Sequence, residues 1–599
     1  MAETQESVSD TKIANQPEDL NQDEKVSRRR RFVLFLSAHW RGVVCLITPL
    51  LFIAVLAPFP PEKYQWCAYT LLIMAVFWVT ECIPLPVTSF LPIVIFPLAD
   101  VMDTRTACLC YINDTIIMFY GSMALAYAVE QSGLHKRVAL GAIRLIGYSH
   151  YRLLLAMSLT TMFISMWITN TAATTMMVPI IFAVLQVFED LNLISTFEKN
   201  ANGDLIASDI TTCYFCAASF SATIGGIGTL VGSATNLVFK GLYERTYPSA
   251  PEYLSFPKYS AFSVPYMLIL EAGLYFTLIV KFLGFLRPKS EIAKRTKIPE
   301  LGKQAAKNVV EQSWKELGNI TFWEIVRQLC QLMVIILFSS AMLLFFCRSP
   351  QIFQGWGDAI SEYFNLNNYK YVRDSAAALL VVFLMLLLPS TLEFFKNFTA
   401  KTRITVSVDD LPKNRITSVL SWTLMDDIMP YSFMFLLGGG FALSEAAKKE
   451  YSDLNGQIGK LLKNLSIFPN HFIMLLIIIF TIFVTNFASN VAVCNVITPI
   501  VMQLAKEINI HPLWYNIVSG VSASFCFCIP VGTPGNLIIQ SSANIPTITM
   551  VSVVLYNIKT GFWPSVATIL ITWFTMYYWA PVIWPDLISA SPQDRYYMT

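Results

Sequence analysis

Long apolar stretches alternate with short polar connections along almost the whole chain. Several of these stretches approach the roughly 20 residues that an α-helix needs to cross a bilayer. The pattern therefore predicts an all-α polytopic membrane protein. Its candidate spans are 42–60, 65–83, 85–101, 115–132, 151–169, 171–188, 211–240, 256–286, 325–347, 374–390, 428–446, 471–488, 489–505, 513–541 and 560–584.

Two pairs of candidate spans follow each other without a polar loop. Span 171–188 continues directly from 151–169, and span 489–505 continues directly from 471–488. Because no loop separates the members of a pair, the pattern predicts one long helix that is broken at each junction.

The two junctions carry the same motif. Asn170 lies in Thr-Asn-Thr and is followed by Pro179, and Asn490 lies in Ser-Asn-Val and is followed at the same spacing by Pro499. A polar amide in an apolar stretch is costly unless it finds a partner. The repetition predicts a fold of two related halves with a polar site between them.

The repeat extends to both sides of the asparagine motif. Two short spans with glycine near the middle, marked by Gly121 and Gly440, precede it and are compatible with re-entrant hairpins. A Gly-x-x-x-Asn-Leu segment follows it in each half, at 232–237 and at 532–537. Each half therefore contains a hairpin, a helix broken at asparagine and a second broken helix, in that order.

A helix that is broken inside the membrane offers unpaired groups to a ligand. Its N-terminal end exposes N–H groups and attracts anions, whereas its carbonyl end, with hydroxyl and amide oxygens, coordinates a monovalent cation such as Na⁺. The repeated breaks predict a site for a small anion flanked by cation sites. A kink held by hydrogen bonds between helices explains a single motif equally well, but the paired set favours the site.

Composition agrees with a membrane protein. Of the 599 residues, 55% are hydrophobic and 14% are charged, whereas soluble domains carry about 25% charged residues. Most cysteines lie in apolar stretches and predict buried thiols without a disulfide framework or metal cluster. The net charge of +2 identifies no partner, and nucleic acid is not expected to bind.

Charged segments predict the orientation and the domain organisation. The polar opening ends in Arg28–Arg31, and a lysine-rich segment starts at Arg287, so both are expected in the cytoplasm. A second basic segment, 396–415, is expected there too. The lysine-rich segment has helical spacing and is either a surface helix or a solvated connector. The predicted divisions are a disordered N-terminus at 1–35, a first membrane half at 36–286, a linker at 287–322, a second half at 323–590 and a tail at 591–599.

Four acidic residues in apolar surroundings are candidate proton or ion relays: Glu81, Glu130, Glu271 and Glu445. Glu130 and Glu445 are explained equally well as residues near the ends of their segments. The run 135–137, His-Lys-Arg, fits either anion steering or an interfacial anchor. An intramembrane enzyme is disfavoured because the sequence has no His-Glu-x-x-His motif and no P-loop.

Taken together, these motifs resemble a known family. The segments 77–81 (Phe-Trp-Val-Thr-Glu) and 436–443, the twin asparagine motifs and the two Gly-x-x-x-Asn-Leu segments are similar to the divalent anion/sodium symporters, solute carrier family 13, and within it to the INDY-type di- and tricarboxylate transporters of insects. The resemblance covers nearly everything after the first 35 or so residues. It implies an inverted-repeat homodimer in which a transport domain moves like an elevator against a scaffold.

The resemblance also implies site residues. Its substrate positions fall on Thr169, Asn170, Thr171, Thr235, Gly440, Ser489, Asn490, Val491 and Thr533. Its sodium positions fall on Ser165, Asn170, Ala234, Thr485, Ala488, Asn490, Gly532 and Pro534. No organic cofactor is implied.

The expected function is secondary transport of di- or tricarboxylates such as succinate and citrate, coupled to sodium, in the plasma membrane. Two departures from the family pattern leave alternatives open. Val491 replaces a hydroxyl residue, and Gly535 stands where the family has proline, which loosens the second sodium site. One alternative function is a sulfate/sodium symporter, because a small tetrahedral anion can use the same N–H groups and hydroxyls, although Val491 favours a larger, partly apolar substrate. The other is a sodium-independent dicarboxylate exchanger, which the resemblance to insect INDY-type members implies.

Overall fold

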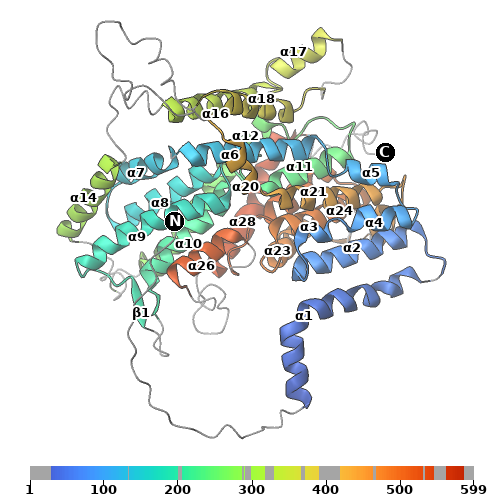
Figure 1. Cartoon of the computed structure of the whole chain (residues 1–599), viewed down its shortest axis with the longest axis horizontal. Helices are drawn as coiled ribbons and strands as arrows, with labels where there is room; N and C mark the ends of the chain where they lie inside the picture. The colour runs from blue at the N-terminus through green and yellow to red at the C-terminus, as the bar shows by residue number, and fades with distance from the viewer. Residues whose placement is uncertain are drawn as a thin grey trace, which may run out of the picture.

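The computed structural model of the chain is built from helices that are packed in several layers (Figure 1). It describes residues 28–57, 59–132, 134–199, 205–286, 289, 299–316, 329–365, 371–389, 418–462, 467–529, 533–545 and 561–585. Most of the polar N-terminus, the basic segment 396–415 and the C-terminal tail lie outside these residues.

In chain order, the elements are α1 (Arg28–Phe52), η1 (Ile53–Leu56), α2 (Lys63–Thr80), α3 (Leu85–Thr88), α4 (Leu91–Leu98), α5 (Thr104–Leu109), α6 (Asp114–Ser132), α7 (Leu134–Ile146), α8 (His150–Ser165), α9 (Asn170–Asp190), β1 (Phe197–Lys199), β2 (Leu205–Ala207), α10 (Asp209–Gly225), α11 (Ala234–Thr246), α12 (Phe256–Phe282), α14 (Glu300–Glu316), α16 (Leu329–Cys347), α17 (Trp356–Tyr363), α18 (Asp374–Leu387), α20 (Trp422–Ile428), α21 (Tyr431–Ala446), α22 (Leu454–Leu462), α23 (Asn470–Thr485), α24 (Asn490–Glu507), α25 (Pro512–Ser522), α26 (Pro534–Ala543), α28 (Phe562–Tyr578) and α29 (Ala580–Ile583).

Five described helical segments are long and apolar enough to cross a membrane: Arg29–Leu56, Thr104–Gln131, Asn170–Asp190, Phe256–Phe282 and Phe562–Ile583. Shorter apolar helices accompany them, including Asn470–Thr485. The predicted all-α architecture holds for the described residues, except that β1 and β2 pair as one small antiparallel ribbon. The ribbon follows α9, outside the helical core.

The first asparagine motif lies at the tip of a helical hairpin, so the predicted single broken helix over 151–188 is wrong. The ring of His150 at the start of α8 contacts the ring of Phe188 near the end of α9, with centroids 5.4 Å apart. This contact requires the chain to reverse direction between the two helices. A turn over 166–169 makes the reversal, and the extended Thr169 caps α9 by accepting a hydrogen bond from the N–H of Ala172.

The second asparagine motif lies at the tip of an equivalent hairpin formed by α23 and α24. The hydroxyl of Tyr515, in the helix that follows α24, donates to Asn470 at the start of α23 over 2.6 Å. The start of α23 therefore lies beside the end of α24, and the predicted straight helix over 471–505 is also wrong. The turn of this hairpin covers 486–489, and Ser489 takes the place of Thr169.

The glycine-containing spans that were expected to form hairpins are continuous helices, α6 and α21. Their glycines permit close helix packing instead of a chain reversal. A Cβ at Gly121 would lie 2.7 Å from the Cβ of Ala378, and a Cβ at Gly440 would lie 2.2 Å from the side-chain amide of Asn495. Because helices approach this closely only where a side chain is missing, glycine is required at these contacts.

The predicted second break is present in both halves, between α10 and α11 and between α25 and α26. Its asparagine holds the unwound backbone in the same way each time. Asn236 donates from Nδ2 to the carbonyl oxygens ten and seven residues earlier, at 2.9 and 2.8 Å. Asn536 repeats both contacts at 3.0 and 3.5 Å. These bonds satisfy carbonyl groups that the interrupted helices leave unpaired.

The two halves are interlocked around these breaks. Helix α11 of the first half packs on α24 and α25, and α26 of the second half packs on α9 and α10. In Figure 1, α26 lies beside α10 for this reason. Hydrogen bonds connect the halves at both breaks: Ser219 donates to Asn536 over 2.7 Å, and the hydroxyls of Thr235 and Ser524 lie 2.6 Å apart.

The lysine-rich linker contains a helix, as its spacing predicted. Helix α14 packs on α7 and α9, where the guanidinium of Arg144 lies 5.8 Å from the ring centroid of Trp314. This packing ties the linker to the first asparagine hairpin.

Candidate functional site

The two hairpin tips face one cavity of about 600 Å³. Most of the residues that the sequence assigned to substrate or sodium line this cavity: Thr169, Asn170, Thr171, Ala234, Thr235, Ser489, Asn490, Val491, Thr533 and Pro534. The structure thus brings together four segments that are far apart in the sequence.

Four helices begin at the cavity wall. They are α9 at Asn170, α24 at Asn490, α11 at Ala234 and α26 at Pro534. Each N-terminus carries a partial positive charge and stabilises an anion by about 0.3–1 kcal/mol. Among the described lining residues there is no lysine, arginine or histidine, and the four helix N-termini are the groups that attract an anion there.

A hydroxyl orients each of the two asparagines. The Oγ of Ser165 lies 2.9 Å from Oδ1 of Asn170 and 2.6 Å from the carbonyl oxygen of Ala222. In the second half, Oγ1 of Thr485 lies 2.8 Å from Oδ1 of Asn490 and 2.7 Å from the carbonyl oxygen at 523. Ser165 and Thr485 do not line the cavity, so they act on it through the asparagines.

Carbonyl oxygens converge beside the first tip. A Cβ added to Gly232 would lie 2.7 Å from the oxygen of Gly226, 2.9 Å from that of Met166 and 3.0 Å from that of Ser165. A Cβ added to Gly226 would lie 2.3 Å from Oδ1 of Asn170. Such a set of neutral oxygens at a broken helix fits a monovalent cation, so these residues suit the expected Na⁺.

The second half is described less completely, because Gly532 lies outside the described residues. Gly535 is the second residue of α26 and faces the first half. A Cβ there would lie 3.0 Å from Oγ1 of Thr174 and 3.2 Å from Oγ of Ser219. The absence of a side chain at this position leaves two hydroxyls of the other half close to the break.

Four expected site residues that the structure describes lie outside the cavity: Ser165 and Thr485, whose contacts are given above, and Gly440 and Ala488. Gly440 is fully buried in α21 against Asn495, whose Nδ2 donates to the carbonyl of Leu436 at 3.1 Å. Ala488 is buried in the turn of the second tip, with 2% of its surface exposed. Both shape the surroundings of the site and do not line it.

The acidic candidates fall into two groups. Glu81 and Glu130 line the cavity. Glu271 is buried elsewhere and accepts a hydrogen bond from Ser221 at 2.8 Å, while Glu445 forms ion pairs with neighbouring basic side chains. Only the first two are placed to affect a bound ligand directly.

An apolar wall completes the cavity, and the motif analysis missed it. Its side chains come from α6, α20 and the start of α21, and they are Phe119, Met123, Tyr127, Met425, Met429 and Phe433. Nothing in the sequence separates these residues from other apolar residues of membrane helices.

The chain is similar over most of its length to a known family of transporters. The sequence profile of the sodium:sulfate symporter transmembrane region matches residues 37–585. The protein "I'm not dead yet" of Drosophila melanogaster is 35% identical over 93% of this chain and 91% of its own length. The Na(+)/citrate cotransporter of Mus musculus is 31% identical over 85% and 90%, and Na(+)/dicarboxylate cotransporter 3 of Rattus norvegicus is 30% identical over 91% and 92%.

Among solved structures, the YdaH transporter of Alcanivorax borkumensis aligns with 90% of this chain and 99% of its own, with a TM-score of 0.49 and 14% identity. The profile match and the full-length relatives confirm the family expected from the motifs. The chain belongs to the sodium:sulfate symporter family, in the solute carrier family 13 branch with INDY, and is an integral membrane transporter and not an enzyme.

Proposed function

We propose that this protein carries di- or tricarboxylates across a membrane by secondary transport and that Na⁺ accompanies the substrate. The observation that carries the proposal is the shared cavity beneath Asn170 and Asn490, at which four helix N-termini meet. Together these ends stabilise one negative charge by about 1–4 kcal/mol. That attraction is modest, so bound cations have to balance a second or third carboxylate.

The shape and lining of the cavity favour a substrate with a carbon skeleton over sulfate. A volume of about 600 Å³ lies within the range of small-molecule sites. Val491, in the second tip, and Met429 add apolar surface to the lining. Carboxylates at both ends of a short chain use both tips, whereas a compact tetrahedral anion leaves the apolar wall without a partner.

The carbonyl oxygens beside Gly232 support a sodium site in the first half. In the second half, Gly535 replaces a proline and leaves the break looser, so we expect the coupling there to be weaker. Exchange of dicarboxylates without sodium and symport of sulfate are the alternatives. Glu81 and Glu130 lie in the cavity wall and disfavour an unaccompanied anion.

The matching contacts of the two halves support an inverted repeat. We expect the cavity to open to either face of the membrane when the two hairpins, together with α10, α11, α25 and α26, move like an elevator. We further expect a homodimer in the plasma membrane with a cytoplasmic N-terminus. The basic run that ends at Arg31 supports this orientation.

Uptake of labelled succinate, citrate and sulfate in cells that express the chain, with and without sodium, tests the proposal. Saturable succinate or citrate uptake that sodium stimulates supports it. Uptake of sulfate alone, or chemical conversion of the label, would contradict it.

A further inference from the structure

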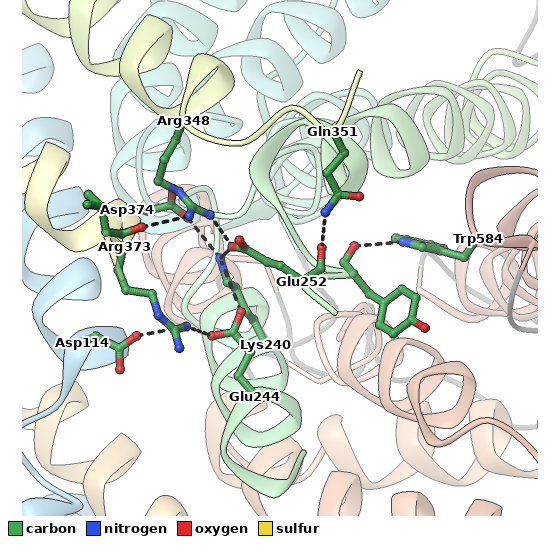
Figure 2. Close-up of polar contacts among 11 residues, drawn as sticks. Asp114, Lys240, Glu244, Glu252, Arg348, Gln351, Arg373, Asp374 and Trp584 are labelled. Carbon is green, nitrogen blue, oxygen red and sulfur yellow. Dashed lines mark hydrogen bonds and ion pairs between the residues drawn. The ribbon is translucent and has the colours of Figure 1, made fainter. Parts of the chain in front are cut away.

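A cluster of buried charges lies outside the cavity, between α11 and the pair α16–α18 (Figure 2). At its centre, the guanidinium of Arg348 donates to both Asp374 and Glu252. The ammonium of Lys240 lies 3.1 Å from Asp374 and 3.8 Å from Glu252. Two cations thus share the same two carboxylates.

A second layer extends the cluster toward α6. Arg373 pairs with Glu244, one turn after Lys240 on α11, and its guanidinium lies 3.4 Å from Asp114 at the start of α6. Figure 2 shows Arg373 reaching from the start of α18 between these two carboxylates. Three basic and four acidic side chains therefore form one continuous network.

The network is sealed from solvent at its centre. The side chains of Arg348 and Glu252 are each 2% exposed, and that of Asp374 is 5% exposed. Surrounding contacts hold the central residues: Arg348 also donates to the carbonyl of Val372 at 3.0 Å, and Gln351 donates to the carbonyl of Glu252 at 3.0 Å. Buried ion pairs are weak sources of stability because desolvation offsets their attraction. Separating the partners of a buried ion pair is nevertheless strongly destabilising, because it leaves an uncompensated charge away from water.

The elements that the network joins belong to two different parts of the structure. Helix α11 begins at the cavity, and Lys240 lies within two turns of Ala234 and Thr235 in its wall. Helices α16 and α18, which carry or adjoin Arg348 and Asp374, contribute no described residue to the cavity and pack on α6 and on each other. A movement of α11 relative to α16–α18 must break these ion pairs and expose or re-pair the charges.

We propose that this network is an electrostatic latch that stabilises the present position of α11 and so sets the balance between the two orientations of the transporter. The inference rests on the proposed alternating transport, and it assigns a role to charges that the binding site does not use. When α11 and the loop after it move away from α16–α18, the ion pairs that cross between them separate: Lys240–Asp374, Arg348–Glu252 and Arg373–Glu244. The latch therefore favours one orientation and slows the exchange between them.

The test removes one charge of each sign, with Arg348→Gln and Asp374→Asn in the same chain. This double variant leaves Lys240 beside Glu252 and leaves the net charge of the network unchanged. The matched control is Lys303→Gln with Glu300→Gln, which removes a solvent-exposed pair on α14. The Michaelis constant for the anion that the parent carries is measured from each face, in right-side-out and inside-out vesicles.

The apparent dissociation constant at one face equals the intrinsic constant divided by the fraction of molecules whose site is open to that face. Loss of the latch changes these fractions, so it must change the ratio of the two Michaelis constants. We expect this ratio to change about tenfold in the double variant, toward equal values, and to stay at the parental value in the control. A ratio within about twofold of the parent, at normal transport rates, overturns the latch.

If the double variant does not reach the membrane, the outer pair is tested in the same way with Glu244→Gln and Arg373→Gln. This variant removes the outer ion pair between α11 and the start of α18 and leaves the central pairs of Arg348 and Lys240 in place. An unchanged ratio in it overturns the proposal. If the parent transports no carboxylate, the proposed function is contradicted and the latch is not. The two failures can be told apart because the ratio of Michaelis constants is measured with whichever anion the parent carries.

Discussion

The hydroxyl of Ser219 in the first half donates a hydrogen bond to Oδ1 of Asn536 in the second half, over 2.7 Å. Both side chains are buried, and Asn536 uses its Nδ2 to hold the carbonyl oxygens of the break before α26. The first half therefore completes the polar structure of the second. A hydrogen bond between the hydroxyls of Thr235 and Ser524 connects the second half to the break before α11.

Replacing Ser219 with alanine should destabilise the protein. The change leaves Oδ1 of Asn536 buried without its donor, which costs about 1–3 kcal/mol. We expect a lower unfolding temperature in detergent and reduced uptake. Ser541→Ala serves as the control, because that exposed hydroxyl bonds only to the carbonyl of Ile538 within its own helix. Equal unfolding temperatures for both variants would show that the contact between the halves is unimportant.

Replacing Gly232 with alanine should abolish the sodium stimulation of uptake. The added methyl group would lie within 3.0 Å of three carbonyl oxygens and occupy the space between them. Uptake against sodium concentration measures the effect. Gly42→Ala provides a matched control, because no atom lies within 4 Å of its added Cβ. Sodium dependence that is equal in both variants would rule out a cation site beside Gly232.

Replacing Gly535 with proline should make the sodium dependence steeper. Proline fixes the backbone of the second break and lowers the entropy lost on binding an ion, on the order of 0.5–1 kcal/mol or a few-fold in affinity. The nearest atom to the added Cβ is Oγ1 of Thr174 at 3.0 Å, so a small shift of that hydroxyl is needed. Sodium titrations of uptake compare the variant with the parent. A parent with steep dependence that the substitution leaves unchanged would show that this position has no bearing on coupling.

The orientation of the chain is tested with epitope tags at its two ends. We expect the N-terminal tag to be inaccessible in intact cells, because the basic run at Arg28–Arg31 stays in the cytoplasm. We expect the C-terminal tag to be accessible, because two related halves give an odd number of membrane crossings. Antibody binding before and after permeabilisation measures both. An N-terminal tag that is accessible in intact cells would reverse the assigned orientation.

The sequence predicted which residues meet at the cavity better than it predicted the path of the chain between them. The asparagine motifs and the second breaks were found because polar residues stand out in apolar spans. The reversal at 166–169 was missed because this turn contains neither glycine nor proline. Hydrophobicity alone does not distinguish a straight broken helix from a hairpin whose arms are both buried.

Other features left weaker or misleading signals. Gly121 and Gly440 suggested hairpins, but glycine also marks close helix packing, and only the neighbours Ala378 and Asn495 decide between these roles. The buried charge network has no local signature, because Arg348 and Glu252 lie far apart in the sequence. Such partners are recognised only when the fold brings them together.

The account depends most directly on the two hairpin tips forming one anion site. Asn170→Ala and Asn490→Ala should each reduce uptake to background while leaving surface expression normal, because each removes an amide that faces the cavity. Binding of labelled succinate and citrate to the purified variants should fall in parallel. Near-parental uptake and binding by either variant, at matched surface levels, would contradict the shared site.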